Sequence, residues 1–132
     1  MPHGDRATVD RLLAHDIWAV VGLSNDRSRA AWGVAAFLQA HGKRIVPVHP
    51  RAETVHGEPG YAQLADVPFD VDVVDLFVRS ELAGPVVDEA IEKGAAKAVW
   101  MQLGVVDLDA AQRAQAAELD VVMDRCPKIE WR

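Results

Sequence analysis

Short apolar runs alternate with longer amphipathic segments along this chain of 132 residues. Apolar runs of about four to eight residues, rich in Val and Ile, are typical of parallel strands that are covered on both faces. The longer segments repeat apolar residues at helical spacing and mostly end at residues that terminate helices, such as glycine. This pattern predicts strands over residues 17–22, 44–48, 71–78, 97–103 and 121–123, and helices over residues 5–15, 28–41, 80–93 and 107–118.

The predicted strands and helices alternate without an internal repeat. Such alternation predicts an α/β fold with a doubly wound, parallel five-stranded sheet, right-handed crossovers and helices on both faces. We expect a Rossmann-like three-layer α/β/α domain over residues 1–132, with strand order 3-2-1-4-5 and a nucleotide above strands one and four. Residues 50–68, marked by Pro and Gly, are expected to form a loop with one helical turn near residues 61–64.

The first predicted strand ends in a turn that is typical of a phosphate-binding site. Because the chain passes directly from strand to helix, backbone N–H groups and the positive end of the helix dipole point at one spot. Gly22 lets the backbone approach a ligand closely, while Ser24 and Asn25 offer a hydroxyl and an amide to phosphate oxygens. An ordinary strand-to-helix turn, with Ser24 as its capping residue, is the alternative interpretation.

The same turn lacks the glycine pattern of NAD-binding folds. That pattern is Gly-x-Gly-x-x-Gly, followed about twenty residues later by an acidic side chain that binds the ribose. This chain has Ser24 at the second glycine position and Arg27 at the third, and its second strand ends in His49-Pro50-Arg51. A basic residue at this place suits a phosphate on the ribose. The sequence therefore favours coenzyme A (CoA) or NADP over NAD.

Composition and net charge limit the classes of protein to which this chain can belong. Half of the residues are apolar and 26% are charged, as in soluble globular proteins. The net charge of −6 argues against general nucleic-acid binding, and we recognise neither a signal peptide nor an apolar run long enough for a membrane span. The single cysteine, Cys126, cannot form an internal disulfide, which suits a reducing cytoplasm. We therefore expect a cytoplasmic protein that binds neither membranes nor nucleic acids.

Few residues suggest catalysis. The histidines show no metal-binding spacing, and Asp72 and Asp75 are three residues apart in one strand, so they face opposite sides. We expect Asp75 near the exposed end of its strand, bonded to backbone amides, and Trp18 and Trp100 in the core. No nucleophile, acid and base combine in a recognisable pattern. The sequence therefore favours a binding protein over an enzyme.

Several motifs carry a family resemblance. The most specific are Trp-Met-Gln-Leu-Gly at residues 100–104 and Met-Asp-Arg-Cys-Pro-Lys-Ile-Glu at residues 123–130, and residues 20–24, 46–50 and 74–80 add to them. Together they resemble the small stand-alone CoA-binding proteins of prokaryotes, which are similar to the N-terminal CoA-binding domain of the succinyl-CoA synthetase alpha subunit. The resemblance implies a Rossmann-like sheet with CoA lying across the strand ends. It does not imply ligase activity, which in the synthetase needs a second domain with a phosphorylated histidine.

The resemblance also implies a set of ligand contacts. Those near the phosphates are Gly22, Ser24, Asn25, Arg27 and Ser28. Those beside the adenosine are His49, Pro50 and Arg51, and the adjoining wall is formed by Phe77, Val78, Arg79 and Ser80. Those facing the middle of the ligand are Met101, Gln102, Leu103 and Gly104. Trp32 departs from the family pattern, in which a less bulky residue is expected.

Cys126 and the function leave alternatives open. Cys126 is either a buried, inert thiol or a redox thiol that forms a mixed disulfide with CoA, because Arg125 and Lys128 would stabilise its thiolate. The leading hypothesis for the function is a non-catalytic protein that binds CoA or acyl-CoA. The alternatives are an NADP-binding, oxidoreductase-like protein and an accessory subunit that docks on a partner enzyme. Trp131 is a candidate for a homodimer contact.

Overall fold

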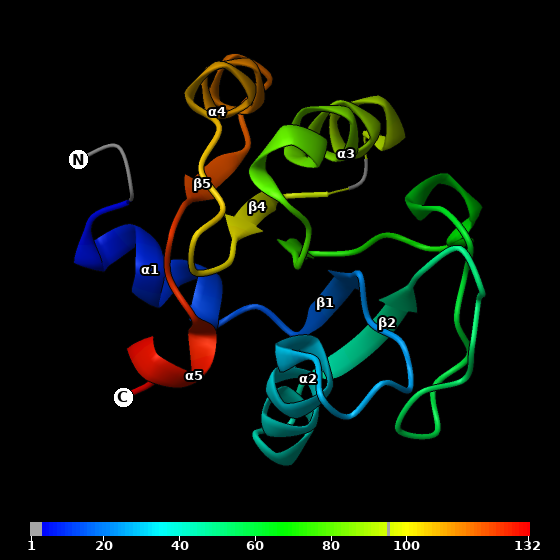
Figure 1. Cartoon of the computed structure of the whole chain (residues 1–132). Helices are drawn as coiled ribbons and strands as arrows, with labels where there is room; N and C mark the ends of the chain where they lie inside the picture. The colour runs from blue at the N-terminus through cyan, green and yellow to red at the C-terminus, as the bar shows by residue number, and fades with distance from the viewer. Residues whose placement is uncertain (1–3, 95) are drawn as a thin grey trace.

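The computed structural model describes residues 4–94 and 96–132 and has a parallel five-stranded sheet at its centre (Figure 1). The strands are β1 (Ile17–Val21), β2 (Arg44–Val48), β3 (Val73–Leu76), β4 (Ala98–Met101) and β5 (Asp120–Val122). The helices are α1 (Arg6–Leu13), α2 (Ala30–Ala40), α3 (Ser80–Lys93), α4 (Leu108–Ala116), α5 (Pro127–Glu130) and the short 3-10 helix η1 (Leu64–Asp66). The predicted fold class is confirmed. The sequence pattern did not predict α5.

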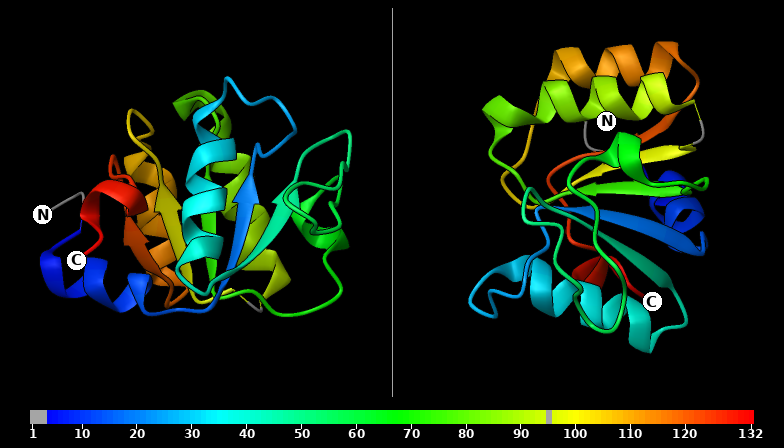
Figure 2. Two further views of the ribbon diagram at one scale, coloured as in Figure 1. Left: turned by 90° about the horizontal axis from the view of Figure 1, so that it is seen from below. Right: turned by 90° about the vertical axis from the view of Figure 1, so that its right-hand side faces the viewer.

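The sheet lies between two helical layers. Helices α3 and α4 cover one face, and α1, α2 and α5 cover the other (Figures 1 and 2). Successive residues of β1 point to opposite faces of the sheet. Ala19 packs in the core between the sheet and helices α3 and α4, whereas Trp18 and Val20 pack in the core on the other face. Trp18 and Trp100 are fully buried, as predicted, with ring centroids 5.7 Å apart. Two apolar cores therefore hold the sheet rigid.

The strand order differs from the prediction. The observed order is β2-β1-β3-β4-β5, so the predicted order 3-2-1-4-5 is wrong. Pro47 gives the physical reason: it has no N–H to donate, so β2 suits an edge of the sheet and not a place between β1 and β3. β3 is buried along its whole length and occupies the centre. The order reverses between β1 and β3, which moves the expected ligand crevice from strands one and four to strands one and three.

Asp72, and not Asp75, has the backbone partners that the sequence suggested for Asp75. Asp72 Oδ2 accepts hydrogen bonds from the backbone N–H groups of Asp16 (3.2 Å) and Ile17 (2.9 Å), and its Oδ1 lies 3.2 Å from Lys97 Nζ. Asp75 was expected near an exposed strand end with backbone partners, and this prediction is wrong. Its carboxyl is fully buried and has no hydrogen-bond partner within the described residues.

Asp75 is buried because β3 is a central strand. Its backbone pairs with Val20 of β1 and Trp100 of β4, so apolar neighbours flank it on both sides. Loss of hydration disfavours the charged form of a carboxyl. Burial accordingly raises the pKa of Asp75 well above its ordinary value. The middle of the sheet therefore contains a buried carboxyl whose neutral form is favoured.

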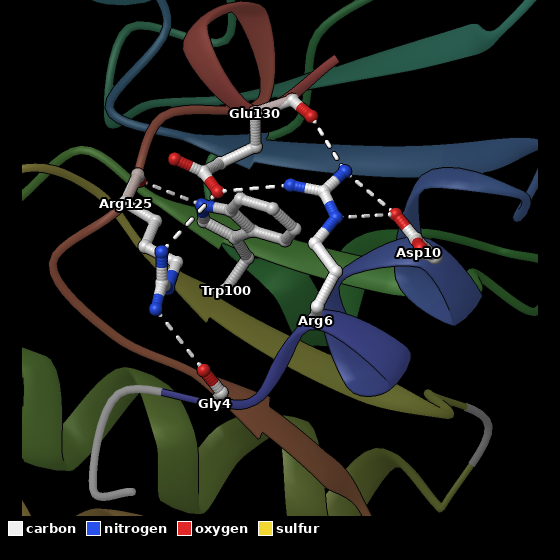
Figure 3. A network of polar contacts seen from close by, with 6 residues as sticks. All are labelled: Gly4, Arg6, Asp10, Trp100, Arg125 and Glu130. Atoms are coloured by element: carbon white, nitrogen blue, oxygen red, sulfur yellow. Dashed lines mark hydrogen bonds and ion pairs between the residues drawn. The ribbon is translucent and has the colours of Figure 1, made fainter. Parts of the chain in front are cut away.

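A network of polar contacts ties the two ends of the chain together (Figure 3). The Glu130 carboxylate accepts hydrogen bonds from Arg6 Nη1 and Arg125 Nη1, both at 3.2 Å, and Arg6 Nη2 also donates to the Glu130 backbone carbonyl at 2.7 Å. Arg125 Nη2 donates to the Gly4 carbonyl (3.1 Å), and Trp100 Nε1 donates to the Arg125 carbonyl (2.7 Å). The motif over residues 123–130 therefore fixes α5 against α1 and β4.

The substitution Asp75→Asn should stabilise the protein at neutral pH but not at acid pH. An unfolded Asp ionises near pH 4, whereas burial raises the pKa of native Asp75 well above that value. The native state consequently loses stability as the pH rises from about 4 through this raised pKa, and an asparagine has no such ionisation. Urea unfolding should show a gain of about 1–3 kcal/mol at about pH 8 and none at about pH 4.

The matched control for this experiment is Asp72→Asn, whose effect should have the opposite sign. Burial opposes the ionisation of Asp72, but the N–H of Ile17 and the Lys97 ammonium outweigh it and lower the pKa of Asp72. The control should therefore be less stable than the native protein at about pH 8. Identical stability of Asp75→Asn and native protein at both pH values would contradict the raised pKa.

The substitution Glu130→Ala should destabilise the protein by about 1–3 kcal/mol, because it removes a charged acceptor shared by two part-buried arginines. Thermal unfolding measures the loss. Asp88→Ala is the control, since it removes an exposed ion pair with Arg113 and should change the stability by less than about 1 kcal/mol. Equal effects of the two substitutions would show that the network in Figure 3 adds nothing beyond an ordinary surface pair.

Candidate functional site

A cavity of about 450 Å³ opens at the carboxyl edge of the sheet, where β1 and β3 end and the strand order reverses. This volume falls within the roughly 300–1,000 Å³ of small-molecule sites. The cavity is lined by Gly22, Ser24, Asp26, Arg29, Ala30, Ala31, His49, Arg51, Phe77, Val78, Gln102, Leu103 and Val105. The lining comes from the segments that follow β1, β2, β3 and β4, so the topology brings together residues far apart in the sequence.

Gly22 sets the distance between the ends of β1 and β3. Its φ is +99°, and a Cβ atom at this position would collide with the Phe77 carbonyl oxygen. Its N–H donates to the Val48 carbonyl of β2 at 2.7 Å. The sequence suggested that Gly22 makes room for a ligand, and the structure shows that it makes room for the backbone of Phe77. Any larger residue would separate the strand ends that frame the cavity.

The amino end of α2 faces the polar part of the cavity. Ala30 and Ala31, the first two residues of this helix, line the cavity, and no side chain of the described residues caps the helix. The first N–H groups of a helix have no partner within it, and together with the helix dipole they attract anions. The helix begins two residues later than predicted. This end of the cavity therefore has the geometry of an anion site.

Asp26 and Arg29 bring opposite charges to this polar end. Asp26 Oδ1 accepts hydrogen bonds from the hydroxyl (2.5 Å) and the N–H (3.0 Å) of Ser28, and these contacts lower the pKa of Asp26. Its Oδ2 lies 3.7 Å from Arg29 Nε. Ser24 is buried, and its Oγ accepts the N–H of Asp26 at 3.2 Å. The turn after β1 is therefore held by its own side chains.

Glu53 connects the turn after β1 with the end of β2. Its Oε1 accepts the backbone N–H of Asn25 (3.1 Å), and its Oε2 lies 3.7 Å from Arg51 Nε. Asn25 Nδ2 donates to the Thr54 carbonyl (2.9 Å), and His49 Nδ1 accepts the N–H of Arg51 (3.2 Å). These contacts place the Arg51 guanidinium at the polar end of the cavity, although its charge is partly offset by Glu53.

The segments that follow β3 and β4 line the cavity with apolar side chains and one amide. The apolar side chains are those of Phe77, Val78, Leu103 and Val105. The Gln102 side chain is only 5% exposed, and its Oε1 has no hydrogen-bond partner within the described residues. A buried amide oxygen without a partner is costly, so it indicates a donor that this structure does not contain. The cavity is thus amphipathic, because charged side chains, the start of α2 and apolar side chains all line it.

A family model described as a CoA-binding domain matches residues 16–132. The chain belongs to the CoA-binding domain family. The resemblance found in the sequence is therefore confirmed, and membership of this family supports CoA as the ligand.

Related proteins and structures agree with this assignment. The uncharacterized protein YneT of Bacillus subtilis (strain 168) is 33% identical over 111 residues, which are 84% of this chain and 82% of that protein. A solved hypothetical protein from Pyrococcus horikoshii OT3 is 34% identical, with a TM-score of 0.91 over 98% of this chain and 92% of that one. The alpha subunit of an ADP-forming acetate–CoA ligase II of Pyrococcus furiosus is 28% identical over 76% of this chain, which spans only 22% of that subunit.

The structure brings about half of the expected CoA contacts to the cavity. Those that line it are Gly22, Ser24, His49, Arg51, Phe77, Val78, Gln102 and Leu103. The other lining residues were not among the expected contacts; they are Asp26, Arg29, Ala30, Ala31 and Val105. Ala30 and Ala31 could not be recognised from residue type, because an alanine side chain has no polar group. They line the cavity through their position at the start of α2.

The remaining expected contacts have other partners. Arg27 lies over the Trp32 ring, 5.2 Å from its centroid, and Arg79 Nε lies 4.0 Å from Glu81. Ser80 Oγ donates to the Gly104 carbonyl at 3.1 Å. Five others do not line the cavity either. Asn25 donates to the Thr54 carbonyl, Ser28 bonds to Asp26 within the first turn, and the Gly104 N–H donates to Asp124. Pro50 is exposed, and Met101 is in the core.

Cys126 is buried in the core that α2 covers and does not line the cavity. Its neighbour Arg125 directs its guanidinium toward Gly4 and Glu130 (Figure 3). A mixed disulfide between Cys126 and CoA therefore stays a prediction, and the buried position favours the alternative of an inert thiol.

Residues 4–94 and 96–132 contain no group of three or more His, Cys, Asp or Glu side chains placed to hold a metal ion. In the same part of the chain, no helix is both long and apolar enough to cross a membrane.

Proposed function

We propose that this protein binds CoA or an acyl-CoA in the cavity at the carboxyl edge of the sheet, without catalysing a reaction. The observation that carries the proposal is the amphipathic cavity at the β1/β3 reversal, with an uncapped helix start at one end and an unpartnered Gln102 oxygen near the other. CoA has the same two parts, because its phosphates are anionic and its pantetheine arm combines methylene groups with amide N–H donors.

The polar end suits the phosphates of the nucleotide. The N–H groups at the start of α2 and the guanidinium of Arg29 can bind the diphosphate, and Arg51 can bind the phosphate on the ribose. Gln102 Oε1 would accept an N–H of the pantetheine arm and so remove the cost of its burial. In this arrangement the ligand runs from the end of β2 across β1 and β3 toward β4.

The side chains of the polar end support binding without catalysis. Two lining residues could in principle act as a nucleophile and its base, Ser24 and His49. In the described structure, however, Ser24 Oγ accepts the N–H of Asp26, and His49 Nδ1 accepts the N–H of Arg51. Ser24 and His49 are therefore not bonded to each other as a nucleophile and base would be. The similarity to an acetate–CoA ligase subunit covers a small part of that subunit. We therefore carry over the binding of CoA and not the ligase reaction.

Calorimetric titration of the purified protein with CoA, acetyl-CoA, NADP and NAD tests the proposal. We expect heat of binding with CoA or acetyl-CoA and none with NAD. Binding of NADP without binding of CoA would show that the cavity belongs to an oxidoreductase-like protein. If none of the four ligands binds, an accessory subunit that docks on a partner enzyme becomes the better explanation.

The substitution Arg51→Ala should weaken CoA binding about tenfold but leave the affinity for dephospho-CoA nearly unchanged. A charge-assisted hydrogen bond to phosphate contributes about 1.5–3 kcal/mol, and the lower value applies here because Arg51 is largely exposed and shared with Glu53. Calorimetry with both ligands measures the difference. Arg11→Ala, which removes an exposed arginine outside the cavity, is the matched control. Equal losses for both ligands in Arg51→Ala would show that Arg51 does not bind the ribose phosphate.

A further inference from the structure

Three exposed leucines lie on the segments that follow β3 and β4, next to residues that line the apolar part of the cavity. Leu103 lines the cavity, yet 56% of it is exposed to solvent. Leu82, at the start of α3, and Leu108, the first residue of α4, are 47% and 55% exposed. We call Leu82, Leu103 and Leu108 the leucine ledge. They are three of the four large apolar side chains that are most exposed in the described part of the chain, the other being Ile129.

One hydrogen-bonded junction holds the leucine ledge together. Ser80 Oγ donates to the carbonyl of Gly104 (3.1 Å) and accepts the N–H of Val106 (3.0 Å), which ties the start of α3 to the loop between β4 and α4. Each leucine of the ledge lies within two residues of this junction in the sequence. The three segments that carry these leucines therefore lie together at the carboxyl edge of the sheet.

Further contacts fix Leu103 in its exposed position. The Gly104 N–H donates to Asp124 Oδ1 at 2.7 Å, and the φ of Gly104 is +79°, a value that favours glycine. The N–H of Val105 donates to the Gln102 carbonyl at 2.9 Å, which closes a turn around Leu103. A single exposed leucine on a mobile loop is ordinary. Leu103, in contrast, is presented to the cavity by a loop that is bonded on both sides.

The orientation of the ligand in the cavity determines which part of the ligand lies near the leucine ledge. Under the proposed function, on which this step rests, the phosphates bind at the α2 end, so the thioester end of the ligand reaches Leu103. A free thiol leaves the ledge exposed to water, whereas an apolar acyl chain would cover it. We infer that the leucine ledge binds the acyl chain of an apolar acyl-CoA, and that this thioester is the preferred ligand over free CoA.

Affinity measured along a series of acyl chains tests the inference. The native protein is titrated with CoA and with its acetyl, butyryl, hexanoyl and octanoyl thioesters. Complete burial of a methylene group strengthens binding about fourfold, and a ledge that covers one side of the chain should give about twofold. Hexanoyl-CoA has four more methylene groups than acetyl-CoA, so we expect it to bind about 16-fold more tightly. Equal affinity along the series, with CoA still bound, would overturn the inference but not the proposed function.

The variants Leu103→Ser and Leu108→Ser locate the effect. The readout is the ratio of the hexanoyl-CoA and CoA affinities within each variant, so that any change common to both ligands cancels. Each variant should lower this ratio at least threefold, whereas Ile129→Ser, which alters an equally exposed apolar side chain outside the cavity, should keep the native ratio. An unchanged ratio in both leucine variants would overturn the ledge as the acyl site. Failure of every thioester and of CoA to bind would overturn the proposed function as well.

Discussion

The close approach of the β1 and β3 ends at Gly22 is the constraint on which the cavity depends. The Phe77 carbonyl occupies the space where any other residue would carry its Cβ. This contact keeps β3 beside β1, and β2 is then confined to the opposite side of β1. Because the chain leaves β1 and β3 toward opposite faces of the sheet, the two connections separate and leave a hollow above the strand ends. Both the anion site and the apolar wall border this hollow.

The elements could be predicted from the sequence, but their order could not be read from local patterns. Apolar runs and caps located all five strands and the helices from α1 to α4, since these signals are local. The order of the strands depends on where a long connection crosses the sheet, and residues 49–72 contain only one short 3-10 helix to indicate this. Pro47 was the available signal, because a strand that lacks an N–H belongs at an edge. Helix α5 was missed because it has only four residues.

The position of the site could be predicted from the sequence because the site lies where the predicted strands end. Sequence reasoning placed Gly22, His49, Phe77 and Gln102 at one edge, and the cavity includes all of them. It could not predict how polar side chains pair with each other. Arg27, Asn25 and Ser28 carry groups that suit phosphate, yet each contacts another part of the protein. Only the pairing of Asn25 involves the loop that contains Glu53, and that loop has no sequence pattern of its own.

The pairing of charges also explains how a protein with a net charge of −6 can accommodate an anionic ligand. Arg29 lies near Asp26, and Arg51 near Glu53, so the cations of the cavity are balanced in the absence of a ligand. Exposed pairs of this kind contribute little to stability, so phosphate oxygens can replace the carboxylates at small cost. The N–H groups at the start of α2 have no such competitor among the described side chains. In the proposed mode of binding, the backbone of α2 therefore supplies the fixed part of the anion site, and the arginines supply the part that would distinguish one phosphate pattern from another.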